Sequence, residues 1–471
     1  MNTKPAAAYR FSQFTAWMAV TILLFTGPPA RAQTVNIPDA NLLAAVRSAL
    51  GIPSGPITQA NMLNLTNLFA GGQNVMDTTG LQYASNLTVL ALDNDPVTNF
   101  TGFSGLGNLT QLQFTSAGLG DVSFVTNLHH LQNAYFTANN LSNAAPLAGL
   151  TNLQSLNINF NRLTNLSPLA SLVHLTNLDL GDNQLTNFSA VSNFTSLLFL
   201  SLSGNATPDV SPVQHLTTLA FLDITSTGVT NFSAVAGLTN LQTLYFPGNQ
   251  VTNAAPLTNL TKLMFLDANQ NALTNIVSLT NLTNMQFLQI AGNQITNLAP
   301  LAKMKKMNSL QIGENPALWD ISPLTNLSAL IYFDAGFDDI TNLPVFTPCT
   351  NLNQMYVSHN QIASTAPLAG LTSLGFLDIG GNQLSNVTGL ANLPMLATVL
   401  LYNNQFSNLT PLTVLTNTTT LSISQNQITD LSPLAGLTNL QSLDVGENYI
   451  SDLSPIAGLV NLTSLSVDSN P

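Results

Sequence analysis

The sequence repeats itself with a period of 22 residues from Leu65 onward. The unit 153–174 reads LQSLNINFNRLTNLSPLASLVH, with Leu or a substitute at positions 1, 4, 6, 11, 14, 17 and 20 and Asn at position 9. Every step is 22 residues except one of 23, between Met307 and Leu330. One such unit cannot bury its own apolar edge, so the units must stack into a solenoid. Position 1 recurs at Leu65, Leu87, Leu109, Leu131, Leu153, Leu175, Leu197, Leu219, Leu241, Leu263, Met285, Met307, Leu330, Leu352, Leu374, Leu396, Thr418, Leu440 and Leu462.

The two halves of the unit predict two kinds of local structure. Positions 3 to 7 form a short strand, with 4 and 6 pointing inward and 3, 5 and 7 outward, because strand side chains alternate. The second half, LTNLSPLASL in residues 163–172, has Leu at every third residue, which favours a 3₁₀-type turn. We expect the Asn at position 9 to satisfy backbone groups that the turn buries. It is Asn in 14 of the 19 units, the exceptions being Gln73, Asp95, Ala117, Thr227 and Asp338.

The motif L-x-x-L-x-L-x-x-N-x-[IL]-x-x-L-x-x-L-x-x-L matches the chain from Leu65 to Pro471. With this motif the chain resembles the bacterial leucine-rich repeat proteins of the internalin type. The resemblance implies an α/β solenoid, a curved right-handed coil with a parallel sheet on its concave face and 3₁₀ or irregular turns on its convex face. It also implies a short helical N-terminal cap, and recognition of another macromolecule without catalysis or a cofactor.

Three segments are expected. Residues 1–32 carry basic residues, the apolar run AWMAVTILLF and the small-x-small pattern Ala30-Arg31-Ala32, which predict a secretory signal peptide cleaved after Ala32. Residues 33–64 form the helical cap. Residues 65–471 hold 18 repeat units of 22–23 residues and a partial terminal unit. The protein is therefore expected to be secreted, periplasmic or on the cell surface.

The cap is predicted from an amphipathic stretch, DANLLAAVRSALG. Asp39 is suited to begin its helix and Gly51 to end it. A second short helix is expected over 58–65. The apolar face that would cover the first coil comprises Leu42, Leu43, Val46 and Leu50.

Charge and cysteine content exclude several classes of protein. The 471 residues include only 9 Lys and Arg against 21 Asp and Glu, so nucleic-acid binding is not expected. Without residues 1–32 the formal net charge would be −15, because that segment holds three basic residues and no acidic one. The single Cys349 excludes a disulfide framework and falls at a Leu position, so it is predicted to be a buried core thiol. Beyond the N-terminal segment no apolar run is long enough to span a membrane.

No motif for catalysis or metal binding stands out. The sequence holds no phosphate-binding loop, no HExxH and no GxSxG. The five His residues are interpreted as solvated turn residues. Lys303, Lys305 and Lys306 form a basic cluster on a loop edge, either solvated or in contact with an anionic partner. Trp319 lies in the 23-residue unit and is expected to pack against the extra residue, with an exposed binding anchor as the alternative.

The outward strand positions carry the candidate site. Aromatic residues recur at positions 3, 5 and 7, and Asp recurs at position 5 but never in neighbouring coils, where like charges would repel. One interpretation is that these residues form a track that binds a partner. The alternative is that internal duplication of coils repeated them, and that they only pack against side chains on neighbouring strands. The candidate binding residues are Phe221, Asp223, Tyr245, Phe265, Asp267, Phe287, Tyr332, Asp334, Tyr356, Phe376, Asp378 and Tyr402.

The sequence thus predicts an exported, non-enzymatic recognition protein whose partner, most readily a protein, binds the concave face. Two alternatives stay open. The repeats could be the recognition module of a larger enzyme or adhesin, because the final unit stops at Asn470-Pro471 without a cap. They could also form a module that binds cell-surface glycans. The oligomeric state cannot be predicted.

Overall fold

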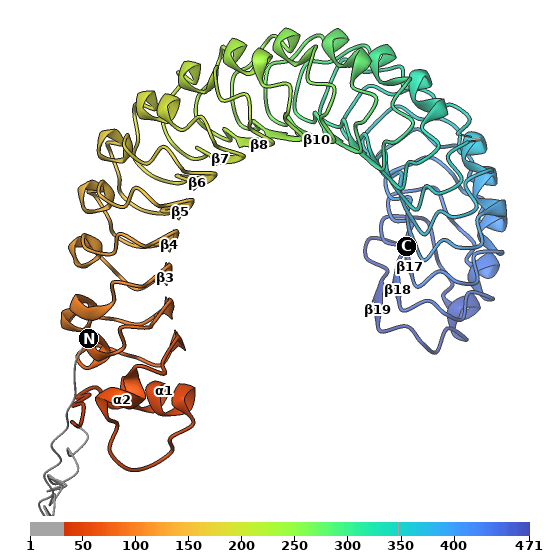
Figure 1. The fold of residues 1–471 in the computed structure, drawn as a ribbon. Coiled ribbons are helices and arrows are strands. Elements are labelled where there is room, and N and C mark those ends of the chain that lie inside the picture. The colour runs from red at the N-terminus through yellow and green to blue at the C-terminus, as the bar shows by residue number, and fades with distance from the viewer. Residues whose placement is uncertain (1–32, 347) are drawn as a thin grey trace, which may run out of the picture.

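The computed structural model describes residues 33–346 and 348–471. The predicted signal peptide, residues 1–32, lies outside the described residues. The described chain forms an arch of stacked coils, with the strands on its inner side and short helices on its outer side (Figure 1). This is the leucine-rich repeat solenoid that the period predicts, with its sheet on the concave face.

One parallel sheet of nineteen strands runs along the described arch. Each strand is three residues long, occupies positions 3 to 5 of its coil and pairs in register with the strand of the next coil, as Phe199–Ser201 does with Phe221–Asp223. The strands are β1 (Asn67–Phe69), β2 (Val89–Ala91), β3 (Gln111–Gln113), β4 (Asn133–Tyr135), β5 (Ser155–Asn157), β6 (Asn177–Asp179), β7 (Phe199–Ser201), β8 (Phe221–Asp223), β9 (Thr243–Tyr245), β10 (Phe265–Asp267), β11 (Phe287–Gln289), β12 (Ser309–Gln311), β13 (Tyr332–Asp334), β14 (Gln354–Tyr356), β15 (Phe376–Asp378), β16 (Thr398–Leu400), β17 (Thr420–Ser422), β18 (Ser442–Asp444) and β19 (Ser464–Ser466).

The convex side carries 3₁₀ helices of three to five residues, as the period-three leucines predict. Pro stands in many of their first turns, as in Ser167–Leu169, where its fixed φ suits the start of a helix. They are η1 (Leu81–Tyr83), η2 (Thr101–Gly105), η3 (Ser123–Val125), η4 (Ala145–Leu147), η5 (Ser167–Leu169), η6 (Ser189–Asn193), η7 (Ser211–Val213), η8 (Ser233–Gly237), η9 (Ala255–Leu257), η10 (Val277–Asn281), η11 (Ala299–Leu301), η12 (Ser322–Asn326), η13 (Ala366–Leu368), η14 (Thr388–Asn392), η15 (Thr410–Leu412), η16 (Ser432–Leu434) and η17 (Ser454–Ile456).

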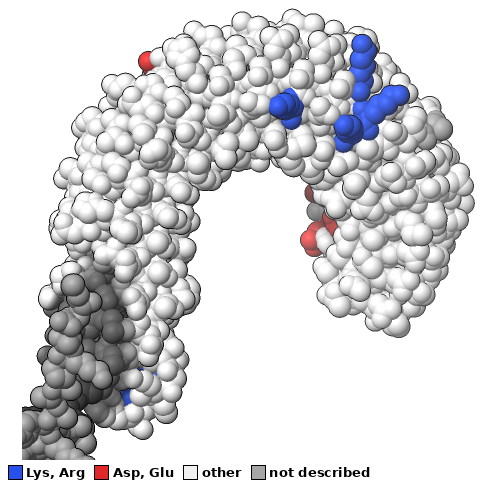
Figure 2. Space-filling view, viewed as in Figure 1, with Lys and Arg blue, Asp and Glu red and all other residues white. Residues whose placement is uncertain are grey.

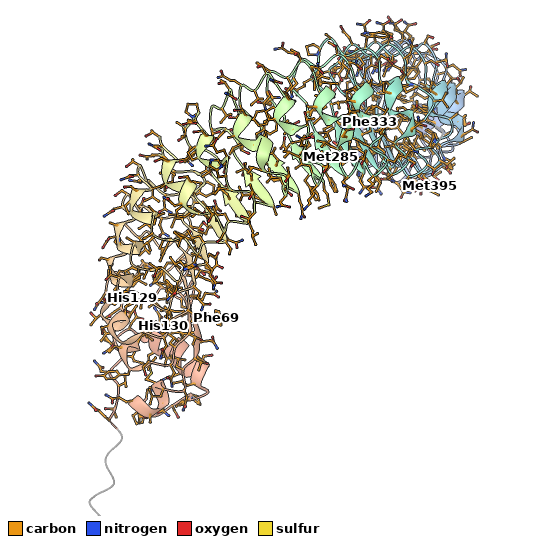
Figure 3. The ribbon with its side chains drawn as sticks, turned by 45° about the horizontal axis from the view of Figure 1, so that its top comes forward. Phe69, His129, His130, Met285, Phe333 and Met395 are labelled. Atoms are coloured by element: carbon orange, nitrogen blue, oxygen red, sulfur yellow. The ribbon has the colours of Figure 1, made fainter. Side chains whose placement is uncertain are left out.

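The core is a continuous column of leucines inside the coils. In the unit 153–174 all seven apolar positions are at most 2% exposed. Other apolar side chains, such as Met285 and Phe333, replace leucine at single positions and are equally buried (Figure 3). Cys349 is buried as predicted, and burial raises the pKa of its thiol.

Asparagine at position 9 joins neighbouring coils through backbone groups, as predicted. The amide nitrogen of Asn183 donates to the carbonyl oxygens of Ile158, Leu180 and Gly181, at 3.0 to 3.1 Å. Its amide oxygen accepts from the backbone N–H of Leu163 in the preceding coil, at 2.9 Å. The same arrangement recurs at Asn249 and Asn382. We call this column the asparagine ladder.

The N-terminal helix α1 (Ala40–Leu50) begins and ends where the sequence predicts. Asp39 Oδ1 accepts from the backbone N–H groups of Asn41 and Leu42, and Gly51 ends the helix with φ 65°. The second helix, α2 (Gln59–Met62), is shorter than the predicted 58–65. Asp39 Oδ2 also accepts from Met76 N at 2.8 Å, so one carboxylate both begins α1 and ties it to the first coil.

The prediction that Trp319 packs into its coil is wrong. The extra residue of this unit is absorbed in the turn before Leu318, where the backbone N–H of Leu318 donates to the carbonyl of Asn315. Leu318 is then the buried residue that other coils hold at position 11. Trp319 therefore falls at position 12, where many other coils expose a threonine, and it is 62% exposed.

Candidate interaction surface

The predicted track lies on the concave side of the sheet. Eleven of its twelve residues are the first or last residue of strands β8 to β15, so they face away from the leucine core. Tyr402 lies two residues after β16, at position 7. Phe287 is 38% exposed, and the others are half-buried by their neighbours.

One group of these residues lies on β8, β9 and β10. Tyr245 is paired with Asp223 on one side and with Asp267 on the other, which makes a row of Asp, Tyr and Asp across three strands. Phe221 and Phe265 lie on the same outer strands, at position 3. The ring of Tyr245 meets that of Phe221 edge-on, with 5.4 Å between ring centroids. We call these five residues the first cluster.

The first cluster continues onto β11. The rings of Phe265 and Phe287 are stacked at 4.7 Å with only 7° between their planes. Together with Tyr245 they line a recess of about 310 Å³. The three rings therefore form one patch on neighbouring strands.

The same row recurs five coils further along the chain. On β13, β14 and β15, Tyr356 is paired with both Asp334 and Asp378. Tyr332 and Phe376 again occupy position 3 of the outer strands, with ring centroids 5.3 and 4.6 Å from that of Tyr356. We call these five residues the second cluster. Both clusters lie on the same concave face, because their residues occupy the same outward strand positions.

The position-5 carboxylates also have a structural role. One oxygen of each Asp accepts from the backbone N–H two residues later, at 2.9 to 3.1 Å in Asp223, Asp267, Asp334 and Asp378. This bond holds the turn that ends the strand and uses one acceptor site of the carboxylate, so the remaining sites can serve a ligand. Burial raises the pKa of Asp267, Asp334 and Asp378 above the ordinary value. These carboxylates are therefore poorly solvated, and a cation close to them would be favoured.

The remaining candidate residues lie away from these clusters. Lys303, Lys305 and Lys306 are exposed on a lateral edge, where the Nζ of Lys306 donates to the amide oxygen of Asn284 at 2.8 Å. Figure 2 shows Lys and Arg atoms on this lateral side and Asp and Glu atoms on the inner side of the C-terminal arm. All five histidines are exposed, and no group of side chains in residues 33–346 and 348–471 could hold a metal ion. Within the same residues no helix is long and apolar enough to cross a membrane.

Comparison with known families agrees with this geometry. The family model described as leucine-rich repeats in two copies matches residues 151–193 and 419–458. The same repeat keeps one register over every strand of the sheet. The chain has the leucine-rich repeat fold.

Solved structures similar to this leucine-rich repeat protein come from bacteria and plants. A leucine-rich repeat protein of Leptospira interrogans is 24% identical, with 86% of this chain and 97% of that chain covered and a TM-score of 0.65. The functional domain of InlJ from Listeria monocytogenes is 21% identical, with 92% and 79% covered and a TM-score of 0.56. The ectodomain of the Arabidopsis receptor kinase HAESA, in complex with a peptide hormone ligand, is 18% identical, with 86% and 79% covered and a TM-score of 0.65. The internalin-like fold is thereby confirmed. No curated protein matches the chain.

An aromatic residue beside the first cluster was missed from the sequence. Phe199 precedes the first cluster on β7, and its ring stacks on that of Phe221 at 4.3 Å. It occupies position 3, so the rule that found Phe221 could also have found it.

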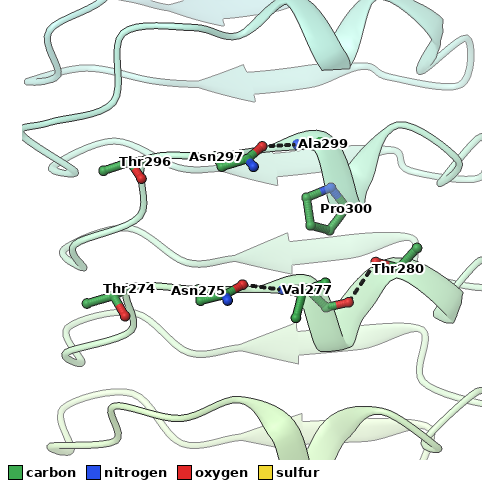
Figure 4. A pocket seen from close by; sticks show the side chains of 8 residues that line it. All are labelled: Thr274, Asn275, Val277, Thr280, Thr296, Asn297, Ala299 and Pro300. Carbon is green, nitrogen blue, oxygen red and sulfur yellow. Dashed lines mark hydrogen bonds between the residues drawn. The ribbon is translucent and has the colours of Figure 1, made fainter.

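The convex turns use asparagine in a way that was also missed. Asn275 and Asn297 at position 13 accept from the backbone N–H two residues later, at 2.8 and 2.9 Å, where each 3₁₀ helix begins (Figure 4). At position 22, Asn284 and others donate to the carbonyl of the preceding coil. These bonds account for much of the asparagine in the chain.

Proposed function

We propose that this leucine-rich repeat protein binds a protein partner on its concave face and catalyses no reaction. The observation that carries the proposal is the recurrence of the aromatic and acidic row in the first and second clusters, both on the inner face of one arch. Aromatic side chains gathered on a concave surface are typical of the core of an interface.

Ring exposure supports this interpretation over simple filling of the sheet surface. Phe287 keeps 38% of its surface exposed beside Phe265, in a chain that buries its core leucines completely. A partner that covers both rings would remove apolar surface from water, which is the main source of binding energy in such interfaces. The recess beside Tyr245 offers a place for an apolar side chain of the partner.

The partner is proposed to be a protein because the surface combines large rings with half-buried carboxylates, which suit apolar and polar side chains of a partner. The peptide hormone bound by the similar Arabidopsis ectodomain is consistent with this class of ligand. Export through the signal peptide of residues 1–32 is part of the same proposal. The acidic chain would then associate faster with cationic partners, and that rate would fall with added salt.

Photo-crosslinking tests the proposed face. A photoreactive phenylalanine derivative is placed at Phe287 on the concave side, or at Val277 on η10 of the convex side, which is 63% exposed. Each variant is irradiated with the protein and glycan extract of its native surroundings. We expect the variant at Phe287 to give one crosslinked protein and the variant at Val277 to give none. Equal products from both sides, or a crosslinked glycan alone, would contradict the proposal.

A further inference from the structure

A second recess opens beside the second cluster. It has a volume of about 270 Å³ and is lined by Ala291, Gly313, Glu314, Asp334, Gly336, Phe337, Tyr356, Ser358 and Asp378. We call it the acidic recess. It lies on the inner side of the arch and is separate from the recess beside Phe265.

The residues at position 7 form the floor of the acidic recess, because the side chain at this position points outward in every coil. In four successive coils this position holds Ala291, Gly313, Gly336 and Ser358, so no large side chain fills the surface. The backbones are close here: a Cβ atom on Gly313 would come within 2.6 Å of the carbonyl oxygen of Gly336. Small residues thus leave a depression at position 7, where the coils of the first cluster hold the larger Thr225, Pro247 and Asn269.

Three carboxylates border the acidic recess. Glu314 is held in place by Gln270, whose Nε2 donates to Glu314 Oε2 at 3.0 Å, and Asp334 and Asp378 are held by their backbone bonds. Burial raises the pKa of Asp334, and the nearby charges of Glu314 and Asp378 raise it further. Burial raises the pKa of Asp378 and the nearby charge of His359 opposes this rise, but no lysine or arginine of the described chain faces these carboxylates. The lysines and arginines of the described chain lie in the cap, at position 10 or at positions 19 to 22 of a coil. They are Arg47, Arg162, Lys262, Lys303, Lys305 and Lys306.

Aromatic rings form the sides of the recess. Tyr356 lies between the two Asp residues, in the row already described. Phe337 is 58% exposed and stacks on the ring of His359 at 4.3 Å. The recess therefore offers negative charge and flat apolar faces together. A planar organic cation can use both, by hydrogen bonds to carboxylates and by stacking on a ring.

We propose that the acidic recess binds the guanidinium group of an arginine side chain on the protein partner. This proposal rests on the proposed function and names the chemistry of one contact. A bare metal ion fits less well, because the carboxylates here do not form a group that could hold one. Lysine fits less well than arginine because its ammonium is a compact charge that cannot stack on a ring or bridge two carboxylates in a plane.

Binding of short fluorescent peptides tests the proposal. A peptide that alternates glycine and arginine is compared with versions that carry lysine or the uncharged analogue citrulline, at about 150 mM salt. We expect the arginine peptide to bind about tenfold more tightly than either other peptide, and Asp334→Asn or Tyr356→Leu to weaken it about tenfold. Asp334→Asn keeps an oxygen that can accept from Gly336, and a thermal melt verifies the fold of both variants.

Asp179→Asn is the matched control. Asp179 also occupies position 5, accepts from Gly181 N at 3.1 Å and has a pKa raised by burial, but it lies on β6, away from the acidic recess. Unchanged binding in this variant supports the proposal. An equal loss in both Asp variants, equal affinity for the lysine peptide, or no binding of the arginine peptide would overturn it. A protein crosslinked at Phe287 would still support the proposed function in that case, so the failure would concern only the acidic recess.

Discussion

The backbone N–H of Asn315 donates to Asp338 Oδ1 at 2.6 Å, inside the asparagine ladder. Asp338 occupies position 9, where 14 of the 19 coils hold asparagine. A carboxylate has no N–H to donate to the carbonyls that the asparagines serve, and Asp338 Oδ2 is buried without a partner. Burial, together with the charges of Asp334, Asp339 and Glu314, raises the pKa of Asp338 to about 8.

The buried Asp338 is therefore predicted to lower the free energy of unfolding at high pH, and Asp338→Asn should remove this loss. The folded chain keeps a proton on Asp338 that the unfolded chain releases above its ordinary pKa of 3.8. The contribution of Asp338 to stability is therefore full below about pH 4 and is lost as the pH rises through about 8. We expect Asp338→Asn to raise the free energy of unfolding at pH 8 by about 1–3 kcal/mol and to change it little at pH 4. Chemical denaturation at both pH values measures this difference, and an equal effect at both would count against it.

The asparagine ladder itself makes a second prediction. Replacing Asn183 by Leu removes the acceptor of Leu163 N and the donor to three carbonyls, all of them buried. The free energy of unfolding should fall by about 1–3 kcal/mol, and Asn249→Leu and Asn382→Leu should behave alike. Asn165→Ala is the control, because Asn165 is exposed and supports only Ser167 N. Melts that are unchanged in all three ladder variants would refute the structural role of the amide.

The link between cap and coils predicts a third effect. Asp39 accepts from four backbone N–H groups, two in α1 and two in the first coil, at Met76 and Asp77. Burial raises the pKa of Asp39, but these bonds outweigh it and leave the pKa below 3.8. Its stabilisation is thus present above about pH 4 and is lost as the pH falls through the folded-state pKa.

Asp39→Ala should lower the free energy of unfolding near neutral pH by about 1–3 kcal/mol, with a smaller loss in acid. Asp430→Ala serves as its control, since Asp430 supports a single exposed turn at Ser432 N. Denaturation followed at pH 7 and pH 3 measures both variants. A loss from Asp39→Ala no larger than that of the control would show that the carboxylate does not join cap and coils.

Much of this fold could be predicted because one sequence rule repeats. The period fixes which residues are buried, and alternation within the strand then places Phe265 and Asp267 on the concave face. Features that depend on backbone conformation did not follow from that rule. Position 8 has a positive φ, between 49° and 72°, in all nineteen coils, and it is held by residues as different as Gly204, Phe160 and Glu447. Only the glycines at some of these positions hint at it.

The acidic recess was hidden for a related reason. The track predicted at positions 3 and 5 contains Asp334, Tyr356 and Asp378, but the depression beside them comes from small residues at position 7. The small residues at position 7 are visible in the sequence, but whether they leave a recess depends on how neighbouring coils pack. The exposure of Trp319 was likewise unpredictable, because it depends on where one extra residue enters the turn.

The central claim is that the concave rings bind the partner, and the dissociation constant of the partner crosslinked at Phe287 tests it most directly. Wild type, Phe265→Ala and the convex control Val277→Ala are compared under identical conditions. Because interface energy concentrates in a few buried aromatic anchors, Phe265→Ala should weaken binding by about 2 kcal/mol, or roughly thirtyfold, while Val277→Ala leaves it unchanged. The thermal melt of Phe265→Ala should stay close to that of wild type, since the ring stacks on Phe287 outside the leucine core. An unchanged dissociation constant for Phe265→Ala, or an equal loss in Val277→Ala, would contradict the claim.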